Sequence, residues 1–522
     1  MARRPPIRLA SLISLRPTLP AIRFAPVFVA GWCAFLFLYG VASGPLYRTE
    51  SLRAIIGRSC LEGHWLYPVL YGEPFLTKPP GHYVAIALCS LPFGEVSAAT
   101  ARLPSVFAAT LAVVLVYGMF RRVLGERAAL LVAVLLPCSV LWLDKVPSAE
   151  IDMTLVGWVT AAIVLFHRDL ERENQQEAYA PRSPNPYMLL ALLCVAGGTL
   201  TKWTAPAFFY LTVIPLLAWR RQLALLFGWR HLIAVSVACA ACALWAFAVM
   251  QQVGWDALAD TIRKEAAYRF APKPSKGYPW SEVATYPLAV FAAHLPVSAF
   301  ALITLRPSFW KQWDARGKLL LQLLHCWTWP NLLFWALVPN HNVRYALPMS
   351  AGLMGLGVMG LLKRPTPQPP PCREGEKELG ACSLALEARV PFSPSLQGGG
   401  WGGGLPFVLA FLLCWLVAKI VFVEVVIPRR TADRNAEATG ASLRDRVPPN
   451  QPLYVLKLKD EGVMFYYARP AARLTDVRAL PPGAHAILIR QEWEDRAAFG
   501  HLELVYCMHD QQGDPVYLVR NP

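Results

Sequence analysis

The chain has 522 residues, of which 55% are hydrophobic and only 16% charged, and its net charge is +16. Soluble domains average about 25% charged residues, so this composition excludes an ordinary soluble protein and indicates a multi-spanning membrane protein. The positive charge does not indicate nucleic-acid binding, because no RNA- or DNA-binding pattern is present and basic residues collect in the cytoplasmic loops of membrane proteins.

The first 23 residues carry arginines, almost no acid and no cleavage site after a short apolar core, so they predict a retained cytoplasmic arm. Apolar runs long enough to cross a hydrocarbon core of about 30 Å then follow. They predict eleven spans: 24–44, 100–120, 128–145, 152–167, 187–201, 203–218, 231–250, 286–305, 319–338, 345–362 and 405–427. With this topology most Arg- and Lys-rich loops fall inside.

The spans divide the chain into a multi-span module at 24–363, with outer loops at 45–99 and 251–285, and a last span at 405–427. Within the first outer loop, "HYVAIALCSLPFG" is too short for a span and predicts a helix in the membrane interface. Residues 364–404 are rich in Pro and then Gly, so they predict a disordered cytoplasmic insert.

After the last span the composition becomes polar, and residues 428–522 predict a small extracytoplasmic α/β domain. Three stretches bounded by Gly or Pro turns have alternating or continuous apolar residues over a short length, which predicts strands. They are "QPLYVLKLK", "AHAILIRQE" and "LELVYCMHD". "DEGVMFYYA" fits a short helix or a strand. The predicted fold class is therefore a polytopic all-α membrane protein with a C-terminal α/β domain.

Several charges stand directly beside apolar helices on the predicted outer face. Glu50 follows the first span, Glu150 and Asp152 stand at the mouth of the fourth, and Lys78 lies in "GEPFLTKPPGHY". Ionisable groups next to hydrocarbon are costly and indicate function, here an acid/base centre beside an anion site. Two alternatives stay open: Asp152 caps its helix, and Lys78 extends toward lipid head groups.

The outer loop 251–285 is basic and aromatic, against the usual charge distribution. Its five cations are Arg263, Lys264, Arg269, Lys273 and Lys276. Such a loop suits an anionic, amphipathic substrate such as a lipid phosphate or sugar, and attraction to anionic membrane lipid is the alternative. Arg344 and Tyr345 begin the tenth span on the same side. No metal-ligand spacing occurs among these residues, and no metal or other cofactor is predicted.

Residues 49–94, followed by "SAATARLPSVFAA", resemble the N-terminal half of GT-C membrane glycosyltransferases. The most similar group is the superfamily of aminoarabinose–lipid A transferases and protein O-mannosyltransferases. "SAEIDM", "GGTLTKWTAP", "EAAYRF" and "RYALP" follow in the order of that group's later motifs, so the resemblance covers residues 25–362 and, loosely, the tail.

The resemblance implies an inner-membrane enzyme that moves a sugar from a polyprenyl-phosphate donor to a lipid, glycan or protein acceptor, as in lipid A modification or protein glycosylation. It implies a monomer surrounded by membrane lipids, with no nucleic-acid partner. Glu50 and Asp152 match catalytic acidic positions. The matched or proposed substrate-binding residues are Lys78, Lys202, Arg269, Arg344 and Tyr345. Thr49 stands where relatives carry an aspartate. Three alternatives stay open: Glu50 takes over the role of that aspartate, Asp152 carries the role alone, or the activity is altered.

Two other classes remain as alternatives: a membrane transporter or lipid flippase, and a non-catalytic relative. Transporters commonly show internal repeats and ionisable groups at mid-membrane. This sequence shows no repeat, and its ionisable groups cluster at one predicted interface. These two observations favour the enzyme.

Overall fold

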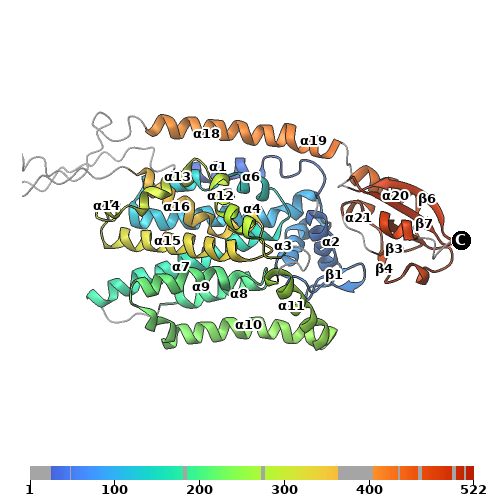
Figure 1. Cartoon of the computed structure of the whole chain (residues 1–522), viewed down its shortest axis with the longest axis horizontal. Coiled ribbons are helices and arrows are strands. Elements are labelled where there is room, and N and C mark those ends of the chain that lie inside the picture. The colour runs from blue at the N-terminus through green and yellow to red at the C-terminus, as the bar shows by residue number, and fades with distance from the viewer. Residues whose placement is uncertain are drawn as a thin grey trace, which may run out of the picture.

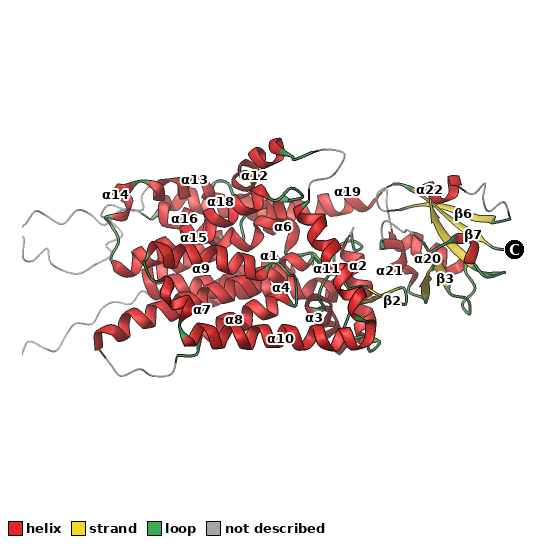
Figure 2. Ribbon diagram, turned by 60° about the horizontal axis from the view of Figure 1, so that its bottom comes forward, coloured by secondary structure: helices red, strands yellow, loops and turns green. Residues whose placement is uncertain are grey.

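The computed structural model describes residues 25–47, 49–179, 185–271, 277–362, 404–432, 436–456, 461–495, 501–510 and 513–522. A long helical bundle occupies most of the molecule, and a small sheet with its own helices lies at one end, which we call the sheet end (Figure 1). Figure 2 shows that the two ends differ in secondary structure as well as in shape. The predicted cytoplasmic arm (1–23) and insert (364–404, except its last residue) lie outside the described residues.

The bundle is built from helices that follow the apolar runs of the sequence. In chain order they are α1 (Ala25–Leu38), α4 (Ala98–Leu124), α5 (Glu126–Leu135), α6 (Val140–Lys145), α7 (Ile151–Tyr179), α8 (Tyr187–Thr199), α9 (Ala205–Trp219), η3 (Leu223–Phe227), α10 (Trp229–Val253), α12 (Trp280–Ala293), α13 (Val297–Ala301), η4 (Leu302–Leu305), α14 (Pro307–Trp310), α15 (Ala315–Leu337), η5 (Val343–Met349), α16 (Ser350–Leu361), α18 (Gly404–Val421), η6 (Phe422–Val426) and α19 (Ile427–Ala432). Each of the eleven predicted spans falls on one to three of these elements.

Local sequence signals fix where the helices begin and end. Ser97 and Thr100 form a reciprocal capping box at the start of α4, and Gly125 ends that helix with a φ of 86°. Asp314 accepts a hydrogen bond from the backbone N–H of Gly317, 2.7 Å away, at the start of α15. These caps satisfy backbone donors that have no partner inside the helix.

Four helices in the described part of the chain are long and apolar enough to cross a membrane. They are Ala98–Leu124, Ile151–Glu173, Trp229–Val253 and the helix that starts at Pro406. A fifth span results if α12 and the segment Val297–Leu305, which meet at 107°, count as one. In Figure 1, α10 and α18 run along opposite edges of the bundle. Both expose many large apolar side chains, as lipid-facing helices do.

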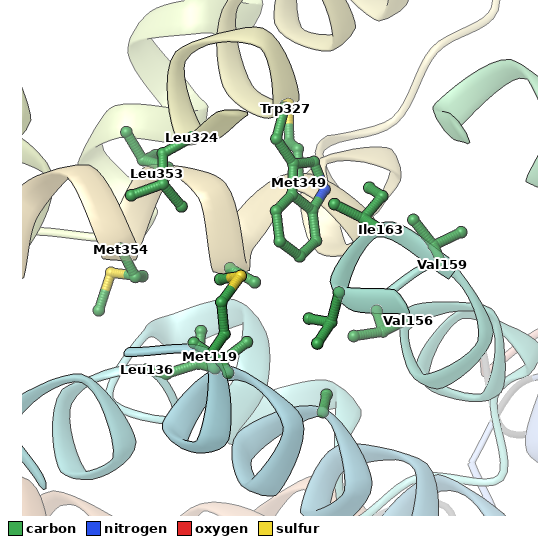
Figure 3. Packing of buried hydrophobic residues seen from close by; sticks show 14 of the residues in the cluster. Met119, Leu136, Val156, Val159, Ile163, Leu324, Trp327, Met349, Leu353 and Met354 are labelled. Atoms are coloured by element: carbon green, nitrogen blue, oxygen red, sulfur yellow. The ribbon is translucent and has the colours of Figure 1, made fainter. Parts of the chain in front are cut away.

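The bundle core lies where α4, α7, α15 and α16 meet. Figure 3 shows its side chains: Met119, Leu136, Val156, Val159, Ile163, Leu324, Trp327, Met349, Leu353 and Met354. The indole N–H of Trp327 donates to the carbonyl of Pro348 at 2.9 Å, so this buried tryptophan leaves no polar group unsatisfied. This core fixes α7 and η5 relative to each other, and both carry candidate site residues.

Helices α13 and α16 approach so closely that the contact requires glycine. A Cβ on Gly357 would lie 2.3 Å from the carbonyl oxygen of Val297. Small residues permit such backbone approach between membrane helices. We expect Gly357→Ala to lower the free energy of unfolding by about 1–3 kcal/mol through overpacking. Thermal unfolding in detergent measures this. Gly31→Ala, which meets nothing within 4 Å, is the matched control, and equal effects of the two would contradict the packing argument.

At the sheet end, short elements connect the bundle to the tail. They are α2 (Thr49–Leu61), β1 (Val69–Leu70), β2 (Glu73–Pro74), α3 (Gly81–Ser90), η2 (Leu91–Phe93) and α11 (Trp255–Phe270). The stretch that was predicted as an interfacial helix forms α3 and η2, and α3 packs between α2 and α4. The indole N–H of Trp245 on α10 donates to the carbonyl of Leu66 at 2.9 Å. This bond ties the first connecting loop to the far edge of the bundle.

The tail forms a five-stranded mixed sheet of order β4-β3-β5-β7-β6. Its elements are α20 (Ala436–Arg446), β3 (Leu453–Val455), α21 (Gly462–Tyr467), β4 (Ala471–Arg473), η7 (Val477–Ala479), β5 (His485–Ile489), α22 (Arg490–Glu494), β6 (Glu503–His509) and β7 (Pro515–Arg520). Strands occur in all three stretches predicted to contain them, and "DEGVMFYYA" contains helix α21. Strands β4 and β7 were not predicted.

Candidate functional site

Five separate segments bring the predicted site residues to the sheet end of the bundle. Asp152 lies in the first turn of α7, Lys202 between α8 and α9, Arg344 and Tyr345 in η5, Arg269 near the end of α11, and Lys78 just before α3. The backbone N–H of Gly81 donates to the carbonyl of Leu200 at 2.8 Å. This bond holds the loop of Lys78 against the loop of Lys202.

Position 81 has no room for a side chain. A Cβ there would lie 2.7 Å from the hydroxyl of Thr201 and 2.8 Å from the carbonyl oxygen of Leu200. The two prolines before it have fixed φ angles. "KPPG" therefore places a cation at a defined position beside the Lys202 loop.

Asp152 is the centre of a buried charge cluster. Its Oδ1 accepts a hydrogen bond from the ammonium of Lys202, and its Oδ2 lies 3.7 Å from Nε of Arg344. The Lys202 Nζ also lies 4.7 Å from the ring centre of Tyr345. Asp152 and Lys202 are only 2% and 5% exposed, and burial lowers the pKa of Lys202. The buried ammonium therefore depends on Asp152 and the face of Tyr345 to remain charged.

Lys78 joins this cluster through α11. Its Nζ donates to Oε2 of Glu265 at 2.6 Å and to the carbonyl of Thr77 at 3.0 Å. Nη2 of Arg269 lies 3.8 Å from the same Glu265 oxygen, and its guanidinium carbon is 5.9 Å from the ring centre of Tyr345. Burial lowers the pKa of Lys78 to about 8. A continuous chain of contacts thus connects Lys78 to Asp152.

Three buried guanidinium N–H groups at this end have no hydrogen-bond partner among the described residues. They are Nη1 of Arg269, Nε of Arg344 and Nε of Arg53. A buried donor without an acceptor costs about 1–3 kcal/mol, and such groups in a folded protein call for an explanation. A bound anion would supply acceptor oxygens, so the arrangement can hold a phosphate.

Glu50 lies in a different arrangement, as the partner of Arg102. Its two oxygens accept hydrogen bonds from Nε and Nη2 of Arg102 at 2.9 and 3.2 Å, and from the backbone N–H groups of Tyr47 and Ala149 at 2.8 Å each. Arg102 also donates to the carbonyls of Val41, Ser43 and Pro45. With both oxygens occupied, Glu50 is suited to fixing the segment that follows α1.

Glu150 connects the two arrangements. Its Oε1 accepts a hydrogen bond of 2.7 Å from the hydroxyl of Thr49. The same oxygen lies 3.6 Å from Nη1 of Arg344 and 3.9 Å from Nζ of Lys145. Arg344 therefore touches both Glu150 and Asp152, which stand two residues apart at the start of α7.

A cavity of about 350 Å³ opens on the Glu50 side of the site. Its lining comes from the segment after α1, the loop between α6 and α7, and the last helix: Ser43, Pro45, Tyr47, Glu50, Arg102, Asp144, Lys145, Pro147, Ser148, Glu150, Phe422, Ile427, Arg430 and Thr431. Of the predicted site residues, only Glu50 lines this cavity. The other six predicted residues belong to the Lys78–Asp152 chain of contacts.

Sequence reasoning did not assign roles to several residues that the structure places at the site. Glu265 pairs with Lys78, and Arg102 pairs with Glu50. Arg53 donates a hydrogen bond to the hydroxyl of Tyr83. The spacing of Glu265 and Arg269, four residues apart on one helix face, is the one local signal for such a pair.

Lys273 and Lys276 lie outside the described residues, and Lys264 pairs with Asp260 in an exposed position. Among the described residues, no three His, Cys, Asp or Glu side chains group as metal ligands do.

The chain that carries this site is similar to proteins of known family. A family model described as dolichyl-phosphate-mannose-protein mannosyltransferase matches residues 77–255, which include Lys78, Asp152 and Lys202. The chain is 28% identical over 314 residues to an undecaprenyl phosphate-alpha-4-amino-4-deoxy-L-arabinose arabinosyl transferase of Pseudomonas aeruginosa (strain LESB58), covering 58% of this chain and 53% of that protein. It is 26% identical over 329 residues to the protein of the same description from Yersinia pestis (strain Pestoides F), covering 61% and 56%. The chain is therefore similar to aminoarabinose and protein mannosyl transferases over part of its length. The resemblance in the sequence is thereby confirmed.

Solved structures show the same GT-C fold. ArnT from Cupriavidus metallidurans, bound to undecaprenyl phosphate, matches with a TM-score of 0.69 and 17% identity over 96% of this chain and 98% of that chain. AglB from Archaeoglobus fulgidus, in complex with an inhibitory peptide and a dolichol-phosphate, matches with a TM-score of 0.50 and 13% identity over 88% and 65%. At these identities the likeness concerns the fold. The chain spans about half the length of the curated relatives it matches.

Proposed function

We propose that the chain transfers a sugar from a polyprenyl-phosphate donor to a lipid, glycan or protein acceptor at the outer face of the cytoplasmic membrane. The observation that carries this proposal is the cation cluster of Lys202, Arg269 and Arg344. Nη1 of Arg269 and Nε of Arg344 are buried without a hydrogen-bond partner among the described residues, and Asp152 contacts Lys202 and Arg344. Undecaprenyl phosphate and dolichol-phosphate in the structures of two GT-C relatives support the donor class.

The cations act on the leaving group. When the bond between the anomeric carbon and the carrier phosphate breaks, negative charge grows on the phosphate oxygens. Donors that are already oriented and buried stabilise this charge without reorganising. Lys202 and Arg344 are held by Asp152, and Arg269 is held against Tyr345. Displacement in one step would invert the anomeric carbon.

Asp152 and Glu50, the two predicted catalytic carboxylates, both remain in the proposed site. Their contacts support different roles for the two residues. Asp152 touches the cations that would hold the phosphate, so it orients them and balances their charge. Glu50 is saturated by four donors, which favours a role in positioning. Lys78 pairs with Glu265 in this structure, so a carrier phosphate competes with Glu265 for the ammonium.

The proposed topology keeps the eleven spans, with residues 1–23 and 364–404 in the cytoplasm and the tail 428–522 outside. The site and the tail share the sheet end of the bundle (Figure 1), which supports chemistry at the outer face. We propose a monomer.

A transporter or flippase would move the lipid-linked sugar without breaking the sugar–phosphate bond. Release of labelled sugar from undecaprenyl phosphate sugars in membranes, together with its appearance on an acceptor, separates the enzyme from both alternatives.

Binding of the donor phosphate should weaken as the pH rises through the pKa of Lys78. Because that pKa is about 8, the charged fraction of Lys78 falls from roughly 90% at pH 7 to roughly 10% at pH 9. Undecaprenyl phosphate glucose is a suitable probe, since its phosphodiester keeps one charge over this range. We expect its affinity to fall about tenfold between pH 7 and 9 in the wild type, and Lys78→Ala to bind weakly at both values.

Lys264→Ala is the matched control, because Lys264 precedes Glu265, the partner of Lys78, on α11 but pairs with Asp260 in solvent. It should keep both the affinity and the pH dependence of the wild type. A wild-type affinity that stays constant from pH 7 to 9, or a Lys78→Ala variant that binds as the wild type does, would remove Lys78 from the phosphate site.

A further inference from the structure

The cavity beside Glu50 and Glu150 is distinct from the cation cluster. It is bounded by the α6–α7 loop on one side and by η6 and α19 of the last helix on the other. Arg430 of α19 lines it, with its guanidinium carbon 6.0 Å from the ring centre of Tyr47 and 5.4 Å from that of Phe422. A volume of about 350 Å³ accommodates a sugar-sized group.

The charges of the described residues that line this cavity cancel. The three carboxylates are Glu50, Asp144 and Glu150, and the three cations are Arg102, Lys145 and Arg430. Most are already paired: Asp144 lies 3.1 Å from Lys145 and 3.4 Å from Arg430, and Glu50 is held by Arg102. Such a lining has no excess positive charge with which to bind an anion, in contrast to the cluster around Lys202. It suits a neutral ligand with hydroxyl groups.

Glu150 is the carboxylate that reaches both places. It lines the cavity, and its Oε1 lies 3.6 Å from Arg344, which in turn lies 3.7 Å from Asp152. Oε1 accepts a hydrogen bond from Thr49, and Oε2 has no hydrogen-bond partner in the described part of the chain. Asp152 and Glu50, by comparison, each have both oxygens engaged by cations or backbone donors.

We propose that this cavity binds the acceptor through a neutral hydroxyl group and that Glu150 is the base that takes the hydroxyl proton. This inference rests on the proposed function. The acceptor oxygen forms a bond to the anomeric carbon, and the bond from that carbon to the carrier phosphate oxygen breaks. The electron pair leaves with the phosphate, and the proton goes to Glu150. An acceptor that attacks through an ionised phosphate has no proton to give and would be repelled by Glu150 and Asp144.

Thr49 fits this assignment. Its hydroxyl donates to Glu150 and fixes the carboxylate at the cavity wall. An aspartate at position 49 would set two carboxylates within hydrogen-bond distance, and like charges that close cannot both ionise readily. Thr49 therefore holds the Glu150 carboxylate at the cavity wall, whereas an aspartate at position 49 would repel that carboxylate. A carboxylate moved to position 49 should replace one lost from position 150.

The test compares Glu150→Gln with the double variant Thr49→Asp/Glu150→Gln in the full-length protein in membranes. The donors are undecaprenyl phosphate sugars carrying aminoarabinose, glucose or mannose, and the acceptors are an alkyl glycoside and lipid A with its phosphates. We expect the wild type to transfer to the glycoside hydroxyl. Glu150→Gln should lower the turnover at least 100-fold, as the loss of a general base does, and leave binding of undecaprenyl phosphate within about twofold. The double variant should regain at least tenfold over Glu150→Gln.

The results that would contradict the proposal each concern one element of it. Transfer by the wild type to phosphate groups alone overturns the hydroxyl acceptor. Turnover of Glu150→Gln above half that of the wild type, or a double variant no better than the single one, overturns Glu150 as the base. Glu494→Gln, an exposed carboxylate paired with Arg490, controls for the loss of a charge. A wild type that neither binds undecaprenyl phosphate nor transfers any of the three sugars overturns the proposed function, and the inference with it.

Discussion

Replacing Asp152 by Asn is expected to lower the turnover of sugar transfer about 100-fold without weakening the binding of undecaprenyl phosphate. The carboxylate holds Lys202 by a hydrogen bond and lies 3.7 Å from Arg344. Without its charge the two cations lose their fixed positions, and a misplacement of about 1 Å in a reacting site costs on the order of 100-fold in rate. Binding does not weaken, because the variant also loses an anion that repels the phosphate.

Turnover and carrier affinity must therefore be measured separately for this variant. Asp152→Glu is the matched control, since it keeps the charge and tests position alone. Added undecaprenyl phosphate should raise the unfolding temperature of Asp152→Asn more than that of the wild type, because it supplies the missing anion. A variant with normal turnover would show that Asp152 serves only to start helix α7.

Arg102→Leu is expected to lower the free energy of unfolding by about 3–5 kcal/mol, as breaking a buried ion pair does. Arg102 and Glu50 are 4% and 5% exposed. The substitution leaves the Glu50 carboxylate buried with its two backbone donors only. It also removes the donors to the carbonyls of Val41, Ser43 and Pro45, which hold the segment after α1 in place.

The double variant Arg102→Leu/Glu50→Leu separates the two possible roles of Glu50. Because it removes both charges, it should unfold at a higher temperature than Arg102→Leu alone. Measurable sugar transfer by this double variant is expected if Glu50 only positions the loop. A double variant that folds and binds undecaprenyl phosphate, yet transfers no sugar at all, would instead make Glu50 a catalytic group.

The sequence predicted the helical segments well because long apolar runs have few structural alternatives. It also singled out "TKPP", whose rigid prolines and following Gly81 hold Lys78 beside the Lys202 loop. Strands β4 and β7 escaped prediction: β4 has three residues, and pairing with distant strands stabilises both. Pairing of this kind depends on the fold more than on local propensity.

The partners of the site residues could not be predicted in the same way. Lys78 pairs with Glu265 across 187 positions, Arg102 with Glu50 across 52, and Thr49 with Glu150 across 101. These pairs exist because the core of α4, α7 and α15 sets the helix positions. The sequence indicated which charges are costly at a membrane edge. Only the structure separates Glu50, which is saturated, from Glu150, which faces the cavity.

The central claim is that the cations at the sheet end form the binding site of the carrier phosphate. A structure of the protein determined with undecaprenyl phosphate tests this claim most directly. We expect density for the phosphate within hydrogen-bond distance of Nη1 of Arg269 and Nε of Arg344, two buried donors that have no partner among the described residues. A carrier phosphate bound elsewhere, with both of these N–H groups still unpaired, would contradict it.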